Sequence, residues 1–483
     1  MGSAIEKLSE KVIELKYGSN ENIFWDEFYT NKGTKDYKIN TVKLRGYLHE
    51  KGFRNYNGEP ILIANNIATK VNPEFIFTDT LEYIESFKNA YLEAAFLKHG
   101  ESLLIKTKSI ILGLKESETE VLRDAVNTSY HYYKNGVVMV SKMKPIELIP
   151  YEEIKGFIWE SSILQREFKM FVDSDEVINQ SMFFKFLTRV TNDEEHLESL
   201  LSAIGYLLHK YKDQRKPIAI IINDENLVDE GKPKGGTGKG IIVKALSSII
   251  EKAMYNGKNS DFTNNKFAYQ NVKDTTNVLV IDDAPRGFDF EGLFSVLTDD
   301  MPIERKHKPM VVFPYSDSPK FVITTNYTIK GTTSSFKRRR FDTYLTNYYS
   351  DTRTPAEEFK CEFFNGWDKE QWQEFDYFMM TCLRKFLSFG LIPFESYDLR
   401  LKMLKNETSA EFYELMEESF NKKRIIYTYS EIRQKLISIF GEKYYFLEKS
   451  HKIVVDWVDR YAEFKKLKVD KRRGNNGYRF EFL

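Results

Sequence analysis

The apolar positions of the first 155 residues indicate a region of mixed helical and extended structure. Apolar residues at helical spacing predict a helix from Val42 to Glu50, which ends before Gly52. Apolar runs rich in β-branched residues predict strands at Ile61–Ile63 and Gly136–Val140. No convincing set of carboxylates and histidines accompanies this pattern, so the role of residues 1–155 stays open.

From residue 156 the pattern becomes helical. Apolar residues between Met182 and Val190 share one helix face, and those between Leu197 and Leu208 share another. We therefore expect a helical segment over residues 156–212 that leads into the next region.

Residues 213–350 combine apolar strands with helices in alternation. Ile218–Ile222 is a continuous apolar run that fits a strand buried on both faces, and Ile241–Leu246 predicts an apolar helix face. Strands that alternate with helices form parallel sheets, which bind their ligands at the carboxyl ends of the strands. The expected fold class is therefore α/β, with a parallel sheet in this central domain.

Two further regions follow residue 350. The pattern of residues 351–395 again predicts helices, rich in aromatic residues, and we expect these to form a helical lid. Residues 396–483 indicate a small separate domain, with helices that start at Ser430 and Ser450 and two alternating runs near the chain end. Helix, helix and hairpin follow one another in a winged helix, so a winged-helix-like domain is expected here.

A glycine-rich run after the first apolar strand has the composition of a phosphate-binding loop. It reads Gly235, Gly236, Thr237, Gly238, Lys239, Gly240. Glycines let backbone N–H groups converge on phosphates, the following helix adds its positive end, and Lys239 would reach the β and γ phosphates of a nucleoside triphosphate. A flexible surface turn is the alternative for such a run taken alone.

Two positions depart from the usual G-x-x-x-x-G-K-[ST] pattern. Pro233 replaces the first glycine, and Asn223 to Lys232 separate the strand from the loop by more residues than usual. Gly240 replaces the Ser or Thr whose hydroxyl normally binds Mg²⁺. The sequence therefore predicts ATP and Mg²⁺ as cofactors, with a metal that depends on other ligands or on water.

Composition and charge narrow the partners. The 483 residues include 71 Lys and Arg and 71 Asp and Glu, so attraction to nucleic acid must come from local basic patches. Cys361 and Cys382 are too few for a zinc cluster or a disulfide framework. No stretch approaches a membrane span and the polar start lacks a signal-peptide core, so we expect a cytoplasmic protein without a membrane partner.

Two acidic residues follow the next buried strand. Val278–Ile281 is apolar, and Asp282 and Asp283 come directly after it. Beside a phosphate-binding loop, Asp282 would hold Mg²⁺, directly or through water, and Asp283 would polarise the attacking water. A buried strand with an acidic turn is the structural alternative, which the loop upstream makes the weaker one.

Polar and basic residues follow the third strand. Lys320–Thr325 runs into Asn326, which could contact the γ-phosphate or orient the lytic water. Arg338, Arg339 and Arg340 come soon after it, and one of them could reach the nucleotide of a neighbouring subunit, a contact that contributes about 10³ to 10⁵ in rate. A bare run of charges is otherwise a solvated face.

Between the second and third strands, Met301–Phe313 predicts a hairpin with a basic tip. The tip contains Arg305, Lys306, His307 and Lys308. A basic tip contacts the phosphates of a nucleic-acid backbone without regard to sequence. His307 alone would be an ordinary surface histidine.

The order and compact spacing of these elements resemble the superfamily 3 helicases, an AAA+ group that includes papillomavirus-type initiator helicases and the primase-helicases of phages and poxviruses. The resemblance covers roughly Lys216 to Tyr349. It implies that Lys239 binds phosphate, that Asp282 and Asp283 form the Walker B pair, and that Asn326 is the sensor residue.

The resemblance also implies a mode of action. One of Arg338 to Arg340 would act on a neighbouring subunit, and Lys306 to Lys308 would project into the channel of a hexamer and hold one strand of DNA. We therefore expect an ATP-dependent DNA helicase that acts as a ring in the replication of a phage or mobile element. Its partners would be single-stranded or forked DNA, further copies of the chain, and a separate primase or polymerase.

The C-terminal region carries a second basic patch, which includes Lys471, Arg472 and Arg473. This patch could bind a phosphate backbone, and a merely solvated face explains it almost as well.

Two alternatives to a helicase stay open. An ATP-gated replication initiator or loader would bind DNA through its winged helix without processive unwinding, and Gly240 favours this alternative. A nucleotide kinase ranks far behind, because kinases do not need an arginine cluster after a basic hairpin.

Overall fold

The chain divides into two units, one that ends at Met170 and one that spans Phe171–Leu483. The computed structural model describes residues 23–172, 174–225, 236–258, 265–307, 309–329, 331, 333–394, 397–422, 424–449, 451–474 and 477–483. The division falls at Met170 rather than near residue 155, because β9 (Ile158–Trp159) pairs with β5 (Ile67–Lys70) of the first unit. The first part of the expected helical segment 156–212 therefore folds with the N-terminal region.

The first unit contains, within its described residues, three small sheets and several short helices. The helix and strands expected from Val42, Ile61 and Gly136 onward are confirmed as α2, β4 and β7. The remaining strands are β1 (Trp25–Tyr29), β2 (Lys35–Ile39), β3 (Phe53–Tyr56), β6 (Thr128–Tyr133) and β8 (Glu147–Ile149), and β4 and β7 span Glu59–Ala64 and Gly136–Ser141. The helices are α2 (Thr41–Glu50), α3 (Pro73–Glu85), α4 (Ala90–Gly100), η2 (Glu101–Lys106), α5 (Ser109–Leu112), η3 (Tyr151–Glu153) and η4 (Glu160–Ser162).

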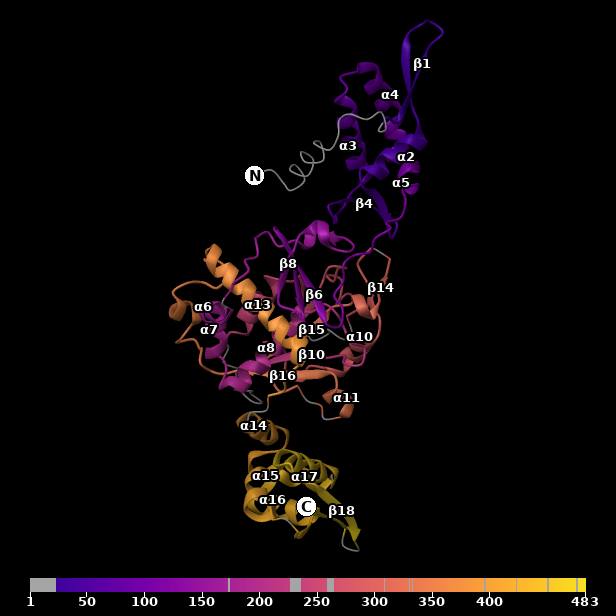
Figure 1. The fold of residues 1–483 in the computed structure, drawn as a ribbon. Helices are drawn as coiled ribbons and strands as arrows, with labels where there is room; N and C mark the ends of the chain where they lie inside the picture. Colours follow the sequence, from indigo (N-terminus) through magenta and orange to yellow (C-terminus); the bar gives the residue numbers. More distant parts are fainter. Residues whose placement is uncertain are drawn as a thin grey trace. The chain divides into compact units, whose positions relative to one another are not determined.

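A five-stranded parallel sheet forms the centre of the second unit, as the alternating pattern predicts (Figure 1). Its order is β11-β12-β15-β10-β16. The strands are β10 (Ala219–Asp224), β11 (Lys252–Asn256), β12 (Val278–Ala284), β15 (Lys320–Thr325) and β16 (Arg340–Leu345). Because β15 lies between β10 and β12, the residues that follow these three strands meet at one edge of the sheet.

Continuous apolar runs place these strands in the core. Ile220, Ile221 and Val322 are fully buried, as expected for a parallel sheet covered on both faces. Helices α8 (Glu194–Leu208) and α13 (Lys369–Phe389) pack against each other and lie side by side in Figure 1. Their approach requires Gly205, because a Cβ atom there would lie 2.1 Å from the carbonyl oxygen of Cys382.

Shorter elements connect the sheet and its helices. The two apolar faces expected around residues 182–208 are confirmed as α7 and α8. The connecting elements are α6 (Ser174–Gln180), α7 (Met182–Arg189), α9 (Lys239–Ser247), η5 (Glu291–Leu293), α10 (Phe294–Thr298), β13 (Met301–Ile303), β14 (Val311–Phe313), η6 (Tyr315–Asp317), α11 (Ser334–Lys337) and α12 (Pro355–Phe359).

The C-terminal part has its own buried core around Phe412, Tyr461 and Phe480. Its elements are α14 (Tyr397–Glu407), α15 (Ala410–Leu415), η7 (Met416–Phe420), β17 (Ile426–Thr428), α16 (Tyr429–Phe440), η8 (Gly441–Lys449), α17 (His451–Lys465), β18 (Val469–Gly474) and β19 (Gly477–Phe482). The three strands form an antiparallel sheet in the order β17-β19-β18. Helix, helix and hairpin thus occur in the expected order, and the assignment as a winged helix stays a prediction.

None of the helices within the described ranges combines the length and the apolar character that a membrane crossing requires.

Candidate functional site

The carboxyl ends of β10 and β15 meet around the ammonium group of Lys239, the first residue of α9. Lys239 Nζ lies 2.5 Å from Oδ1 of Asn326, which follows β15, and 2.5 Å from Oδ1 of Asp224, which ends β10. The lysine side chain is 13% exposed and that of Asp224 is 2% exposed. Two residues chosen from the sequence, Lys239 and Asn326, are therefore in direct contact at the edge of the sheet.

The loop before α9 adopts a backbone that glycine favours. Gly236 and Gly238 have φ values of +96° and +106°, in the left-handed region. A Cβ atom at Gly238 would also lie 2.5 Å from the ring of Phe186 in α7. Successive N–H groups in such a turn can form a concave anion-binding site, which matches the predicted contact with phosphates.

The other loop positions differ in burial and contacts. Thr237 is buried, and its hydroxyl donates a hydrogen bond to Asp224 Oδ1. Gly240 lies in the first turn of α9, where nothing approaches within 4 Å of a Cβ atom placed on it. Gly235, which was also expected to bind nucleotide, lies outside the described residues.

The end of β12 contains a bulge that presents Asp282 and Asp283. Ile281 pairs with Ile323, but the next pair is Ala284 with Thr325, so the two acids lie within the irregularity. Asp283 has φ +56°, an uncommon value for a residue with a side chain. Uncommon backbone conformations of this kind concentrate at functional sites.

Thr324 fixes both acids from the neighbouring strand. Its hydroxyl donates to Asp282 Oδ1 over 2.7 Å and accepts from the backbone N–H of Asp283 over 2.8 Å. This single hydroxyl therefore orients the Asp282 carboxylate and the Asp283 backbone together.

Gly257 supports the bulge from the other side. Its N–H donates to the Asp282 carbonyl over 2.6 Å, and a Cβ atom at this position would lie 2.7 Å from that oxygen and 2.8 Å from Ala284. Sequence reasoning missed this residue because it also missed β11, the edge strand that precedes it.

A surface lysine pairs with the second acid. Lys258 Nζ lies 2.7 Å from Asp283 Oδ2, with side chains 71% and 37% exposed. The hydrogen bond to the Asp283 carboxylate raises the pKa of the Lys258 ammonium group. The charge of Asp283 is thus partly balanced at the surface.

Asp224 is a further residue at this site that the sequence reasoning did not select. It is the last residue of β10, and Asp282 and Asp283 lie close to the end of β12, but Asn223–Lys232 had been interpreted as a spacer before the loop. The signal that could have found it is the acid itself, which follows the apolar run Ile218–Ile222 after a single residue, Asn223.

The three arginines of the predicted cluster have different surroundings. Arg340 begins β16, pairs with Asp342 over 2.7 Å and donates to the Ile329 carbonyl. The guanidinium carbon of Arg339 lies 4.6 Å from the centre of the Phe294 ring, and Nη1 donates to a backbone carbonyl. Arg338 is exposed, and its guanidinium donates a long hydrogen bond of 3.4 Å to Ser335 Oγ.

The hairpin between β12 and β15 is confirmed. Met301, Pro302 and Ile303 of β13 pair with residues of β14 in antiparallel register. Arg305 is anchored, because its guanidinium donates to the carbonyls of Gln270 and Val272.

The tip of this hairpin is basic and exposed where it is described. Lys306 and His307 are exposed, and His307 has φ +59°. Lys308 lies outside the described residues. Within the predicted basic tip, the structure therefore separates an anchoring arginine from two exposed side chains.

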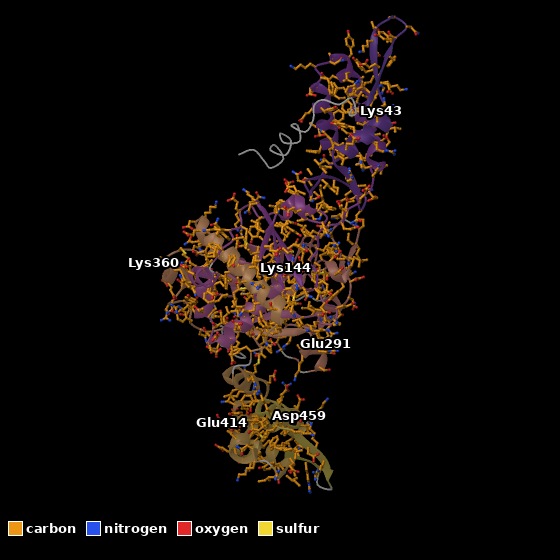
Figure 2. All side chains as sticks on the ribbon, viewed as in Figure 1. Lys43, Lys144, Glu291, Lys360, Glu414 and Asp459 are labelled. Atoms are coloured by element: carbon orange, nitrogen blue, oxygen red, sulfur yellow. The ribbon has the colours of Figure 1, made fainter. Side chains whose placement is uncertain are left out.

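The basic patch of the C-terminal part is partly neutralised. Lys471 Nζ lies 2.6 Å from Asp459 Oδ2, and Arg472 Nη2 lies 2.6 Å from Asp470 Oδ2. Figure 2 labels Asp459 among the charged side chains of this part. The side chain of Arg473 lies outside those that the structure describes.

The carboxylate and amide oxygens at the strand ends are suitable ligands for a hard cation, although they form no large cluster. Among the described residues, no group of three or more His, Cys, Asp and Glu side chains could hold a metal ion. Mg²⁺ often needs only one or two carboxylates together with phosphate oxygens and water. One buried oxygen here, Asp224 Oδ2, has no hydrogen-bond partner among the described residues, which leaves it free to accept a cation.

Comparison with known proteins finds a family model that matches part of the chain and several solved structures that resemble it. Residues 232–340 match a protein family described as a family of unknown function, DUF5906. This segment starts just before the glycine-rich loop and ends within the arginine cluster. No curated protein sequence matches the chain.

Three solved structures illustrate the similarity to known folds. The apo C-terminal region of NrS-1 is 13% identical, with a TM-score of 0.41, over 92% of this chain and 99% of that one. A candidate ATPase from Cytophaga hutchinsonii is 11% identical, with a TM-score of 0.24, over 51% and 73% of the two chains. JCV helicase bound to a small molecule is 14% identical, with a TM-score of 0.22, over 51% and 72%. With TM-scores below 0.5, the roles proposed below rest on the geometry of this chain alone.

Proposed function

We propose that the chain is an ATP-hydrolysing DNA helicase of the superfamily 3 type that works as a ring. The observation that carries the proposal is the contact of Lys239 with Asn326, beside the acids of β12, at the carboxyl edge of one parallel sheet. Lysine, amide and carboxylates at adjoining strand ends are the groups that phosphoryl transfer to water requires.

Each of these residues has a proposed part in hydrolysis. Lys239 and the N–H groups of Gly236 to Gly238 bind the phosphates. Asp282 is a metal ligand, Asp283 accepts a proton from the attacking water, and Asn326 orients that water. Mg²⁺ bound with ATP would supply positive charge at the β and γ phosphates.

Arg338 is the arginine that we propose to act on a neighbouring subunit. Arg339 and Arg340 already make contacts within their own chain, to Phe294 and to Asp342. An arginine that reaches across an interface must be exposed in the separate subunit, and Arg338 meets this condition.

Lys306 and His307 are the proposed DNA contacts, through phosphates of one strand. They are exposed at the hairpin tip, whereas Arg305 holds the hairpin in place. Lys471 and Arg472 contribute less to DNA binding in this proposal, because acids already pair with them.

ATP turnover and strand separation test the proposal directly. The purified chain is expected to hydrolyse ATP faster with single-stranded DNA and to unwind a forked duplex. Lys239→Ala should reduce turnover by at least about 100-fold, because it removes a charge preorganised for the phosphates. Lys244→Ala is the matched control, since Lys244 lies on the same helix with a 57% exposed side chain. Equal turnover in Lys239→Ala and wild type would refute the proposal.

Mixing two inactive variants tests the ring. Lys239→Ala lacks a working nucleotide site but keeps Arg338, and Arg338→Ala has the opposite defect. In a ring with shared sites, mixed assemblies should regain turnover, because some interfaces combine an intact site with an intact arginine. A mixture as inactive as its components, or a chain that stays a monomer with ATP analogue and DNA, argues against shared sites.

The second candidate is an ATP-gated initiator or loader that binds DNA without processive unwinding. Gly240, with no hydroxyl for the metal, favours it because it is compatible with slow hydrolysis. DNA-stimulated ATP turnover without strand separation would support the loader over the helicase.

A further inference from the structure

The oxygens around the Lys239 ammonium group have the composition of a cation site. Asp224 Oδ1 and Asn326 Oδ1 each lie 2.5 Å from Lys239 Nζ. The Thr237 hydroxyl is hydrogen-bonded to the same Asp224 oxygen. Asp224, Asn326 and Thr237 are called the oxygen cradle below. Carboxylate, amide and hydroxyl oxygens are the ligands that hard divalent cations prefer, and here the ammonium group occupies the cation's place.

One oxygen of the oxygen cradle has no hydrogen-bond partner among the described residues. It is Oδ2 of Asp224, which is 1% exposed. A buried carboxylate oxygen without a donor or cation is costly. This arrangement favours a ligand that carries more positive charge than one ammonium group.

Nucleotide binding would take positive charge away from the oxygen cradle. An ammonium group has three N–H donors; Lys239 donates one to Asn326 Oδ1, and its Nζ also lies 2.5 Å from Asp224 Oδ1. Contact with both the β and γ phosphates uses two donors, so the ammonium group cannot stay bonded to both cradle oxygens. The phosphates also bring further negative charge close to the buried Asp224 carboxylate, which is unfavourable unless a cation intervenes.

The usual metal ligand of such loops is absent as well. Gly240 has no hydroxyl, and the space around its Cα is open to 4 Å on the side where a side chain would project. Asp224 lies at the other end of the same loop, with its carboxylate against Lys239.

We propose that the oxygen cradle binds a divalent cation when Lys239 turns to the nucleotide phosphates, with Asp224 as the ligand that replaces the missing hydroxyl. The role of Lys239 in this inference rests on the proposed function. The site itself is made of protein oxygens, so it can be tested without nucleotide.

Mn²⁺ binding to the nucleotide-free Lys239→Ala chain tests the site. Removal of the ammonium group empties the oxygen cradle, so the variant should bind Mn²⁺ at least about tenfold more tightly than wild type, as followed by electron paramagnetic resonance. The double variant Lys239→Ala with Asp224→Asn should lose this gain, and Lys244→Ala should not show it. Equal Mn²⁺ affinity in wild type and Lys239→Ala would overturn the inference, and so would a gain that persists in the double variant.

A second measurement keeps the inference testable if Lys239→Ala does not fold, which its thermal unfolding would reveal. With saturating ATP analogue, Asp224→Asn should weaken Mn²⁺ binding by about 10- to 100-fold relative to wild type. Its affinity for the analogue without metal should be unchanged or higher, because a nearby negative charge is gone. Asp289→Asn, at an exposed acid of the same unit, is the control. An equal loss of nucleotide affinity with and without Mn²⁺ would show that Asp224 only orders the loop, and would overturn the inference.

The two measurements also separate this inference from the proposed function. A wild-type chain that binds no adenine nucleotide refutes the proposed function, while Mn²⁺ binding to Lys239→Ala still decides whether the oxygen cradle is a cation site. Nucleotide binding with a metal dependence that Asp224→Asn leaves unchanged refutes the inference alone.

Discussion

Two strands of the central sheet carry, at or next to their last residue, an acid that pairs with a lysine, and the two pairs differ in burial. Asp224 at the end of β10 pairs with Lys239, with side chains 2% and 13% exposed. Asp283 at the end of β12 pairs with Lys258, with side chains 37% and 71% exposed. The buried pair places both charges where solvent cannot replace a lost partner, whereas water can solvate either member of the exposed pair.

This difference indicates two kinds of acid at one edge of the sheet. Asp224 is fixed by its neighbours and suits the binding of a cation. Asp283 is reachable from solvent, lies in a bulge with φ +56°, and suits contact with a water molecule.

Asp283→Asn should have the largest effect, because an amide cannot accept the proton of the attacking water. We expect ATP turnover to fall by about 10² to 10⁴, the usual contribution of a general base. Binding of an ATP analogue should be unchanged, since the variant keeps the shape of the side chain. Steady-state turnover and fluorescence titration measure the two quantities. Turnover within about threefold of wild type would assign the proton to another group.

Lys239→Ala should destabilise the region around β10 by about 3 to 5 kcal/mol, because it leaves the Asp224 carboxylate buried without its partner. The double variant with Asp224→Asn should recover most of this loss, since no unpaired charge remains. Hydrogen exchange of amides in β10 and α9 is the suitable measurement, because a chain of two units need not unfold in one step. Equal exchange in the single and double variants would refute the idea that losing the Lys239 partner of Asp224 destabilises this region.

The contrast between the two acidic strand ends explains how far the sequence alone could predict the site. Asp282 and Asp283 were predictable because they directly follow an apolar run and lie downstream of a glycine-rich loop. Asp224 follows its apolar run one residue later, after Asn223, and the prediction placed the phosphate site at the glycines and Lys239 instead. The parallel sheet was predictable from alternation, whereas the position of β15 between β10 and β12 depends on long-range pairing.

Other features could not be deduced from local pattern. The arginine cluster is one run in the sequence, but Phe294 and Asp342 fix two of its members and leave Arg338 exposed. Gly257 must be a glycine because the backbone of β12 approaches its Cα closely. The residues next to Gly257 in the sequence give no sign of this approach. The contacts of Arg339 with Phe294 and of Gly257 with β12 join segments that are distant in the chain, whereas Arg340 pairs with Asp342 two residues away.

Gly257→Ala should have an intermediate effect, and it should act on Asp282 and Asp283 of β12 but not on Asp224. The new Cβ atom would meet backbone atoms of Asp282 and Ala284 at 2.7 and 2.8 Å, so the bulge must shift. We expect a loss of stability of about 1 to 3 kcal/mol and a fall in turnover of up to about 100-fold, because the acids are displaced. Calorimetry and steady-state turnover are the measurements.

Gly46→Ala provides the control, because nothing lies within 4 Å of a Cβ atom at that helical position. It should leave turnover unchanged and raise stability slightly, as expected for glycine in a helix. A Gly257→Ala chain that behaves like Gly46→Ala would show that the bulge tolerates movement, and it would weaken the assignment of Asp283 to a precise position.

Lys258→Ala should have the smallest effect, and it tests whether the exposed pair is as dispensable as its exposure indicates. Water can replace the ammonium group at Asp283, so the thermal midpoint should not change measurably and turnover should change by less than about threefold at 0.15 M salt. Because screening weakens an exposed pair, any difference from wild type should be greatest at low salt and should vanish as salt rises. A loss of turnover close to that of Asp283→Asn would mean that Lys258 positions the acid. The two lysines would then serve their acids in the same way, and burial would not be the property that distinguishes the two ends of the sheet.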